Sequence, residues 1–331
     1  NFRRNGRAFW SLIIFTILFG LSLFAEFIAN DKPLLVRYDG DFFVPVLVNY
    51  PETTFGGDFE TEAEYSDPEV AELIEEKGWI VWPMIPYSFD TVVLGLAKPS
   101  PSPPSSQNWL GTDDQGRDVV ARLIYGFRTA MLFSLVLLVF NYAIGVAIGC
   151  MMGYWGGAFD LFFQRIIEIW SNVPFLYVIM IVASIITPGF WTLLFIMAFF
   201  GWTAMTWYMR TATYKEVSRD YVMAARALGA SGSRIVFRHI LPNSVSTLIT
   251  FVPFSVASGI TALTALDYLG FGLPAPTPSW GELLKQGTEN MESLWLVGSV
   301  VVAMTLILML VAYVGEAIRD AYDPRKFSFY E

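Results

Sequence analysis

Long apolar segments without charged residues constrain this sequence more than any other feature. Residues 169–209 contain no Asp, Glu, Lys or Arg. A helix needs about 20 apolar residues to cross the hydrocarbon core of a bilayer, which is about 30 Å thick. The run is therefore long enough for two spans, and Thr187-Pro188-Gly189 is expected to form the turn between them.

Four further apolar segments predict a polytopic membrane protein. Hydrophobic residues make up 54% of the 331 residues and charged residues only 15%, which is too apolar for a soluble chain of this length. The first segment is longer than the apolar region of a cleaved signal peptide, so we expect it to remain as a span. The expected fold class is all-α with six transmembrane helices, over residues 8–28, 129–152, 244–265, 293–315 and two within 169–209.

Basic residues in the short connecting segments predict the side on which each segment lies. The N-terminal end carries three arginines, residues 153–168 one, residues 210–243 six basic residues and the C-terminal tail three. The short segment 267–292 carries only Lys285. Because cytoplasmic loops carry an excess of Lys and Arg, we expect both termini and residues 210–243 in the cytoplasm.

The segment between the first two spans predicts a separate acidic unit outside the membrane. It is rich in Asp and Glu and ends in a Pro/Ser linker at residues 98–106. Asp67 and Pro68 are suited to begin a short acidic helix, and residues 41–50 have a strand-like composition. The acidic side chains could dock or guide a ligand, or could simply keep a loop solvated.

The stretch after this linker predicts an amphipathic helix on the outer membrane surface, capped by a residue between Thr112 and Gln115. The expected domains are the N-terminal end with the first span (1–30), the acidic insert with its linker (31–107), the surface helix (108–128), the transmembrane core (129–317) with the 210–243 loop, and the cytoplasmic tail (318–331).

A basic and polar island, residues 221–243, interrupts the apolar sequence. Its first part predicts a short helix that ends at Gly229, because glycine permits a sharp turn. A second short helix is expected to end at Pro242, before the fifth span. The small side chains of Ala224 and Ala225 would let another protein approach this helix-turn-helix closely.

The sequence predicts neither an enzyme nor a cofactor-binding protein. It contains no GxxxxGK[ST] phosphate-binding loop, no nucleophile–base pair and only one His and one Cys. The spans lack the ionisable residues of a proton relay. Asp267, near a span end, could face the pathway, although an interfacial position also explains it. Five residues could unwind or line a passage, although helix packing also explains small and polar residues in spans: Asn172, Pro174, Ser255, Ser258 and Gly259. We expect no cofactor, no metal and no nucleic-acid partner.

Three segments resemble one family of membrane proteins. LGTDDQGRDVVARLIYG, residues 110–126, is similar to the signature that precedes the transport domain in permeases of the dipeptide/oligopeptide/nickel ABC importer family. Residues 224–243 resemble the EAA loop of bacterial ABC importer permeases, although Met223 replaces the usual acidic residue and His239 stands where Ile is usual. LDYLGFGLPAPTPSWGELL, residues 266–284, resembles the outer loop between the last two spans of that family.

The resemblance implies a type I ABC importer permease fold and two sets of site residues. The coupling set would dock on an ATPase subunit and comprises Tyr221, Met223, Ala224, Ala225, Arg226, Leu228, Gly229, Arg234, His239, Leu241 and Pro242. The outer set carries the family motifs on the periplasmic side and comprises Gly111, Thr112, Asp113, Gly116, Arg117, Asp118, Gly270, Gly272, Pro278, Trp280 and Gly281.

The resemblance also implies a function. The chain would be the permease subunit of an ATP-driven, binding-protein-dependent importer of oligopeptides or peptide-like antibiotics in the bacterial inner membrane. Its partners would be the lipid bilayer, a second homologous permease chain, one or two ABC ATPase subunits that bind the ATP, a periplasmic peptide-binding protein and the oligopeptide.

Three alternatives stay open. One is a permease of the same family for nickel or another solute. A stand-alone secondary transporter or channel would need ionisable residues in its spans or an inverted repeat. A receptor that acts through its acidic outer unit would leave five spans unexplained.

Overall fold

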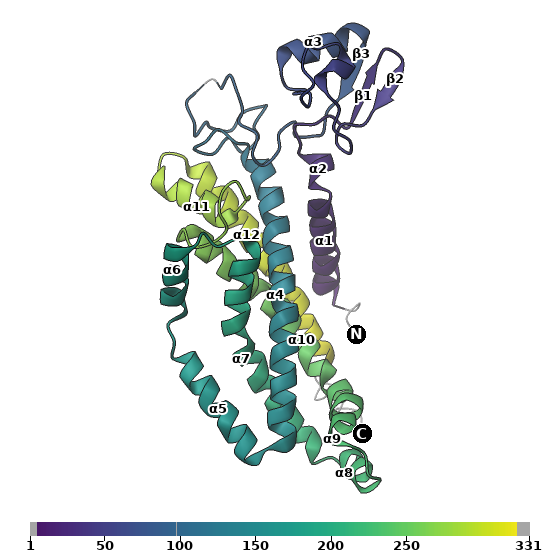
Figure 1. Ribbon diagram of the computed structural model, residues 1–331, viewed down its shortest axis with the longest axis vertical. Helices are drawn as coiled ribbons and strands as arrows, with labels where there is room; N and C mark the ends of the chain where they lie inside the picture. The colour runs from purple at the N-terminus through teal and green to yellow at the C-terminus, as the bar shows by residue number, and fades with distance from the viewer. Residues whose placement is uncertain (1–4, 97, 323–331) are drawn as a thin grey trace.

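Long helices that run along the molecule form most of its structure (Figure 1). The computed structural model describes residues 5–96 and 98–322. A small unit with three strands lies at one end, and the short helix α8 (Asp220–Ala227) lies at the opposite end. The prediction of a helical core with a mixed insert between the first two long helices is confirmed.

Within the described residues, five helices are long and apolar enough to cross a membrane. They are α1 (Gly6–Leu23), α4 (Val119–Trp155), α7 (Phe190–Val217), α10 (Leu241–Tyr268) and α12 (Leu294–Tyr322). Helices α5 (Gly157–Ser171) and α6 (Phe175–Ile185) meet at a bend of 66° and make a sixth span if they are counted together. On that count the predicted six spans are confirmed.

The second span is much longer than predicted. Its 37 residues correspond to a rod of about 55 Å, against a hydrocarbon core of about 30 Å. The prediction of a separate surface helix over residues 108–128 is wrong. Residues 119–128 are the first turns of α4, and no proline interrupts α4. Asp118, rather than a residue between Thr112 and Gln115, caps the helix by accepting a hydrogen bond from the Ala121 N–H at 2.9 Å.

The third span also differs from the prediction. Residues 157–168, expected in a loop, form most of α5. The break falls just before Pro174, because proline disfavours helical geometry in the residue that precedes it and has no N–H to donate. The expected break at Thr187-Pro188-Gly189 is confirmed, since α6 ends at Ile185 and Gly189 precedes the first residue of α7.

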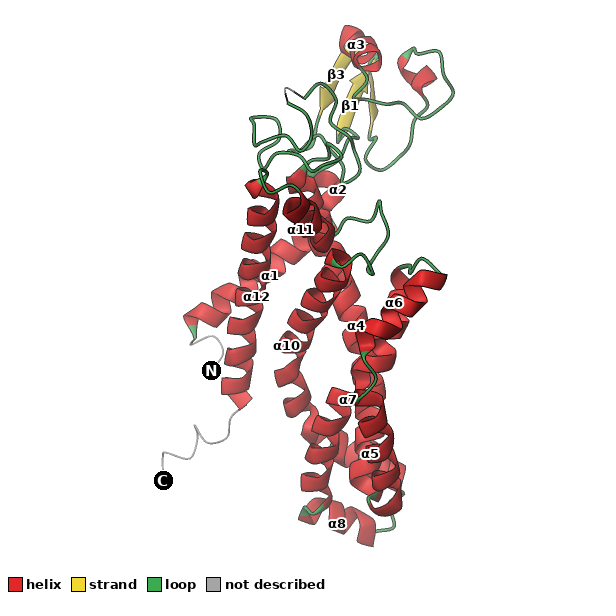
Figure 2. Ribbon diagram, turned by 90° about the vertical axis from the view of Figure 1, so that its left-hand side faces the viewer, coloured by secondary structure: helices red, strands yellow, loops and turns green. Residues whose placement is uncertain are grey.

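A stripe of glycines lets α4 and α7 approach closely. A Cβ atom on Gly145 would lie 2.8 Å from the Trp202 carbonyl oxygen, and one on Gly149 would lie 2.6 Å from the Thr206 carbonyl oxygen. Small residues at four-residue spacing are a common means of close helix packing in membranes. On the other side of α10, α1 packs against α12 (Figure 2).

The outer unit has its own small core. Strands β1 (Leu35–Tyr38), β2 (Asp41–Phe43) and β3 (Gly78–Val81) form an antiparallel sheet in the order β2-β1-β3, and η2 (Glu52–Phe55) and α3 (Pro68–Lys77) complete the unit. Side chains from the sheet, η2 and α3 form the buried cluster, which includes Val36, Tyr38, Phe55, Val70 and Ile74. A short helix, α2 (Ala25–Ile28), joins this unit to α1.

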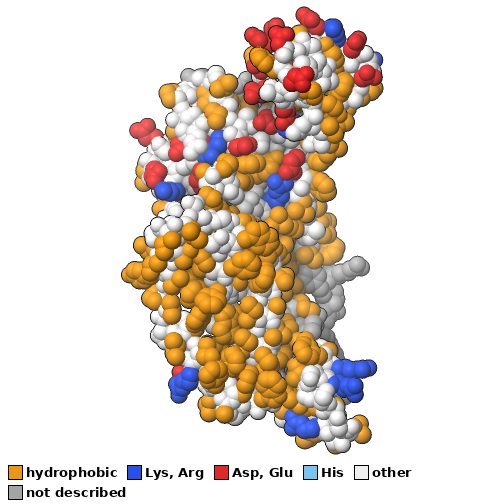
Figure 3. Space-filling model, in the orientation of Figure 1, with side chains coloured by type: hydrophobic (Ala, Val, Ile, Leu, Met, Phe, Trp, Pro, Cys, Tyr) orange, Lys and Arg blue, Asp and Glu red, His pale blue; other side chains and the backbone are white. Residues whose placement is uncertain are grey.

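The predictions for the outer unit are confirmed in part. Asp67 accepts a hydrogen bond from the Glu69 N–H at 2.9 Å, and Pro68 begins α3. The strand expected over residues 41–50 ends at Phe43, two residues before Pro45, because proline cannot donate to a strand ladder. Acidic side chains gather on this unit and apolar ones over the middle of the molecule (Figure 3). Of the expected tail, 318–331, residues 318–322 end α12 and the rest lies outside the described residues.

Candidate coupling loop, outer clamp and membrane cavity

The first helix of the island forms as predicted and ends in a tight turn. After α8 the backbone reverses at Gly229, which has a φ of +76°. The Gly229 N–H donates to the Arg226 carbonyl, and the Ala230 N–H donates to the Ala225 carbonyl, both at 3.0 Å. These two bonds define a Schellman motif, for which glycine is favoured because it has no Cβ. The turn fixes the direction in which the chain leaves α8.

The second half of the island corrects a prediction. Helix α9 (Gly232–Ile235) passes through a π turn, η3 (Val236–Ile240), directly into α10. Pro242 therefore does not end a helix but lies in the first turn of α10. The π turn accommodates this proline because the regular α-helical bonding pattern has already been interrupted before it. The Leu241 N–H donates to the Val236 carbonyl, five residues earlier, and not to the carbonyl four residues earlier as in an α-helix. The loop is thus continuous with a span.

The inner face of this helix-turn-helix packs on the ends of α4 and α7. Val222, Ala225 and Ile235 are buried against Cys150 of α4 and Met209 of α7. Only 9% of Ala225 is exposed, so its predicted place on the docking surface is wrong, and its small side chain instead lets α8 pack inward.

The outer face carries most of the remaining predicted coupling residues. Leu228 is 88% exposed and Met223 52% exposed, so this face offers apolar surface beside basic side chains. Tyr221, Ala224, Arg226, Gly229, Arg234 and Pro242 are also exposed, whereas His239 and Leu241 are half-buried.

Aromatic side chains hold the loop in place. The Arg226 guanidinium lies over the Tyr154 ring, 5.4 Å from its centre, and a Cβ atom on Gly232 would lie 2.9 Å from the same ring. The Tyr221 hydroxyl donates to the Glu216 carboxylate. Burial and this carboxylate raise the pKa of Tyr221 to about 12, so the phenol remains a hydrogen-bond donor at neutral pH.

Two of the predicted outer residues, Asp113 and Arg117, meet Arg122 and Glu282 in a largely buried network of four residues that we call the outer clamp. Arg117 donates to Asp113 at 2.7 Å and to Glu282 at 2.9 Å. Arg122 donates to Glu282 and, at 3.0 Å, to the Phe89 carbonyl. Burial tends to lower the pKa of Arg117, but the hydrogen bonds and charges of the two acids outweigh it and raise that pKa. The clamp joins the start of α4 to α11 (Trp280–Glu289).

The second outer motif packs against the first. The Trp280 ring stacks on Phe127 and its indole N–H donates to the Leu123 carbonyl at 3.0 Å. Asp267 accepts hydrogen bonds from the Leu273 N–H and the Ser279 hydroxyl.

Backbone geometry explains the glycines of both motifs. Gly111, Gly116 and Gly270 have positive φ angles, and a Cβ atom on Gly272 or Gly281 would collide with its surroundings. Thr112, Asp118 and Pro278 are buried beside them. Residues 110–118 and 270–281 thus meet at one end of α4 and have a structural role. Sequence reasoning missed Arg122, although it is a lone charge in the mainly apolar stretch 119–127, and Glu282, which lies in a polar segment with Lys285 and Glu289 and has no such signal.

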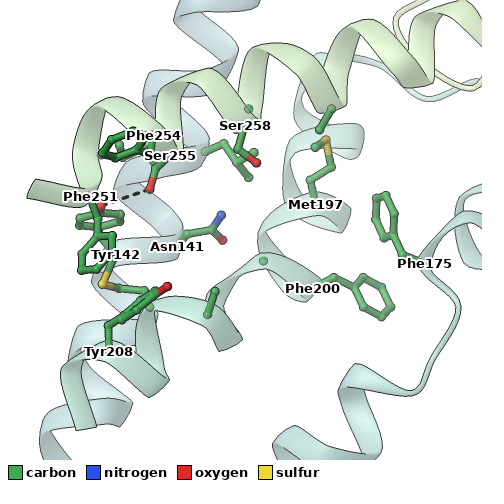
Figure 4. Close-up of a pocket in the computed structure, with 17 residues that line it drawn as sticks. Asn141, Tyr142, Phe175, Met197, Phe200, Tyr208, Phe251, Phe254, Ser255 and Ser258 are labelled. Atoms are coloured by element: carbon green, nitrogen blue, oxygen red, sulfur yellow. Dashed lines mark hydrogen bonds between the residues drawn. The ribbon is translucent and has the colours of Figure 1, made fainter. Parts of the chain in front are cut away.

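A cavity of about 450 Å³ lies between α4, α7 and α10 (Figure 4). Its polar side chains are Asn141, Tyr142, Tyr208, Ser255 and Ser258. The Tyr142 and Ser255 hydroxyls are hydrogen-bonded at 3.2 Å. No charged residue is among those that line it. Of the five residues considered for a passage, Ser255, Ser258 and Gly259 line the cavity, whereas Asn172 and Pro174 do not. Asn141, a lone carboxamide in an apolar span, was missed.

Comparison with known proteins places these features in a family. Residues 145–328 match the family described as "Binding-protein-dependent transport system inner membrane component". Over 326 residues the chain is 47% identical to the inner membrane ABC transporter permease protein YejE of Escherichia coli (strain K12), covering 98% of this chain and 96% of that protein. It is 44% identical to the peptidoglycan transport system permease protein YejE of Agrobacterium fabrum, covering 98% and 92%.

More distant similarities agree with this placement. The dipeptide transport system permease protein DppC of Bacillus subtilis is 31% identical over 67% of this chain and 70% of its own length. Among solved structures, the inward-facing MetNI methionine ABC transporter superposes with a TM-score of 0.51 at 18% identity, over 61% of this chain and 96% of that one. At 18% identity, the similarity to the MetNI transporter shows a shared fold alone.

Proposed function

Because this chain belongs to the family of binding-protein-dependent transport system inner membrane components, we propose that it is a permease subunit of an ABC importer of peptides. Several relatives are named for peptide, dipeptide or oligopeptide transport. The Agrobacterium relative is named for peptidoglycan transport, and peptidoglycan also carries peptide stems. The substrates in these names therefore have the peptide unit in common.

The observation that carries this proposal is the two-sided packing of the helix-turn-helix. Its inner face is buried on α4 and α7, and its chain continues without a break into α10. Its outer face exposes Met223, Ala224 and Leu228. A subunit that binds this face and moves would carry three membrane helices with it as rigid elements. The partner would be an ATPase subunit, which supplies the energy that this chain lacks the motifs to supply.

The distribution of charge supports one orientation. Basic residues of the loop and acidic residues of the outer unit lie at opposite ends (Figure 3). By the positive-inside rule the loop and both termini are cytoplasmic, and the outer unit faces the periplasm. A peptide-binding protein would deliver substrate on that side, next to the outer clamp. A second, related permease chain would complete the path.

The stand-alone transporter is the less favoured alternative. Such a protein would drive transport through ionisable groups in the membrane, and the described residues that line the cavity carry none that is charged. The names of its relatives point instead to a subunit of a larger machine.

The test is an Ala224→Arg variant in cells that express the whole importer. The new side chain lies on the exposed face of α8 and should block contact with the ATPase subunit. We expect ATPase subunits to co-purify with the parent chain and to be lost, or uncoupled from peptide uptake, in the variant. Thr288→Arg, at an exposed position at the opposite end, is the matched control and should change neither. Normal uptake and co-purification in Ala224→Arg would refute the coupling role.

A further inference from the structure

The membrane cavity combines neutral polar groups with aromatic walls. Asn141 and Tyr142 come from α4, and Ser255 and Ser258 come from α10. Phenylalanines supply much of the remaining wall: Phe175, Phe200, Phe251 and Phe254. Because the lining carries no charge, it can form no ion pair with a charged side chain of a bound molecule. Selection by this cavity must therefore depend on dipoles and shape.

Among the residues that line the cavity, Asn141 is the one with a buried polar atom that has no hydrogen-bond partner. Its carboxamide points into the cavity (Figure 4), and its Oδ1 atom is buried without a hydrogen-bond partner among the described residues. Leaving a buried acceptor unpaired is unfavourable, and such atoms are uncommon in folded proteins. This oxygen has almost no exposed surface, but Asn141 lies on the cavity wall and is only half-buried, so a turn of the carboxamide brings the atom to a molecule that enters the cavity.

The neighbouring helix is shaped around this side chain. A Cβ atom on Gly201 of α7 would lie 2.6 Å from Asn141 Nδ2 and 2.9 Å from Oδ1. Only glycine leaves room for the carboxamide at this position. The fold thus accommodates an unpaired polar group at the α4–α7 contact, where an apolar side chain would pack at less cost.

We propose that Asn141 binds the backbone of a transported peptide, with its Oδ1 accepting a hydrogen bond from a peptide N–H. This inference rests on the proposed function and identifies the group that the cavity recognises. A carboxamide offers an acceptor beside two donors, which matches the N–H and C=O that every peptide unit presents. The Tyr142–Ser255 hydroxyl pair offers a second polar contact on the same lining. Recognition is then of the backbone, and the aromatic walls contact side chains of varied type.

The experiment compares two probes in two forms of the complete importer. The probes are tri-alanine and its analogue methylated on the central backbone nitrogen, which lacks that N–H. Uptake of each is measured in cells whose only peptide importer contains either the parent chain or Asn141→Leu. Any effect of methylation on capture by the binding protein is the same in both forms, so it cancels in the ratio of ratios.

We expect the parent importer to prefer tri-alanine over the methylated probe, and Asn141→Leu to reduce that preference by about three- to tenfold, the value of one hydrogen bond. Thr261→Val, which removes an exposed hydroxyl of α10 outside the cavity, should keep the parent preference. An unchanged preference in Asn141→Leu overturns the inference while leaving the importer intact. If the parent importer takes up neither probe, the proposed function itself is overturned.

Co-purification of ATPase subunits shows whether each variant assembles. If Asn141→Leu does not accumulate in the membrane, Asn141→Ser replaces it, because serine is small and polar but too short to reach the same position. The same loss of preference is expected for Asn141→Ser, and its absence would count equally against the inference.

Discussion

Arg117 donates a hydrogen bond of 2.9 Å to Glu282, although the two residues lie 165 positions apart in the chain. Arg117 is 3% exposed and Glu282 24% exposed. Glu282 also bonds Arg122, whose side chain is fully buried. One carboxylate on α11 thus neutralises part of the charge of two guanidinium groups at the start of α4. The outer ends of these helices are held together by a network that tolerates little change.

Glu282→Gln should destabilise the protein strongly. Removing the Glu282 charge leaves Arg117 and the fully buried Arg122 to share the single carboxylate of Asp113, and breaking a buried ion pair costs about 3 kcal/mol or more. We expect a lower unfolding midpoint in urea for detergent-solubilised protein. Glu289→Gln, at an exposed position on the same helix, should have little effect. Equal midpoints for the two variants would mean that the outer clamp contributes little to stability.

Gly149→Ala should separate α4 from α7. The added methyl group would lie 2.6 Å from the Thr206 carbonyl oxygen, and overpacking of this kind costs about 1–3 kcal/mol. Gly298→Ala is the matched control, because no atom lies within 4 Å of the methyl position there. We expect thermal unfolding to shift downward for the first variant and to remain unchanged or shift upward for the second.

The Tyr221 hydroxyl should make stability depend on pH at the alkaline end. Burial and Glu216 raise its pKa to about 12 from the ordinary value of 10.0. A raised pKa in the folded state contributes stability that is fully present below about pH 10 and is lost as the pH rises through about 12. The difference in unfolding midpoint between the parent chain and Tyr221→Phe should therefore shrink or reverse over that range. A constant difference would show that Tyr221 is not perturbed.

Gly201→Val should impair transport more than assembly. Its side chain would occupy the space of the Asn141 carboxamide and displace it from the cavity. We expect peptide uptake to fall by about tenfold or more, the effect of losing one polar contact together with the obstruction. ATPase subunits should still co-purify, because the coupling loop is distant. Loss of the subunits would indicate a general packing defect instead.

The lengths of the apolar runs, together with the residues that break or cap helices, were sufficient to predict most of the bundle. They identified the break at Gly189, the turn at Gly229 and the cap at Asp67, since each depends on local chemistry. They failed at boundaries that tertiary packing decides. The early start of α4 depends on the Asp118 cap and on contacts with α11, and the inward orientation of Ala225 depends on the ends of α4 and α7.

The candidate site was only partly predictable for the same reason. Motif resemblance named Arg117 and Trp280 but not Glu282, to which Arg117 is bonded, or Asn141. A lone polar residue in an apolar span has no periodic signal, because its importance depends on which helix faces it. Only the three-dimensional contact with Gly201 distinguishes Asn141 from the many polar residues that simply bond to their own helix.

The unbroken length of α4 has a mechanical consequence. Arg122, near its first turn, belongs to the outer clamp, and Tyr154, near its last, supports Arg226 of the loop. A straight helix transmits tilt from end to end without a joint to absorb it. Arrival of a partner on either side of the membrane would therefore be felt on the other side as a change of angle.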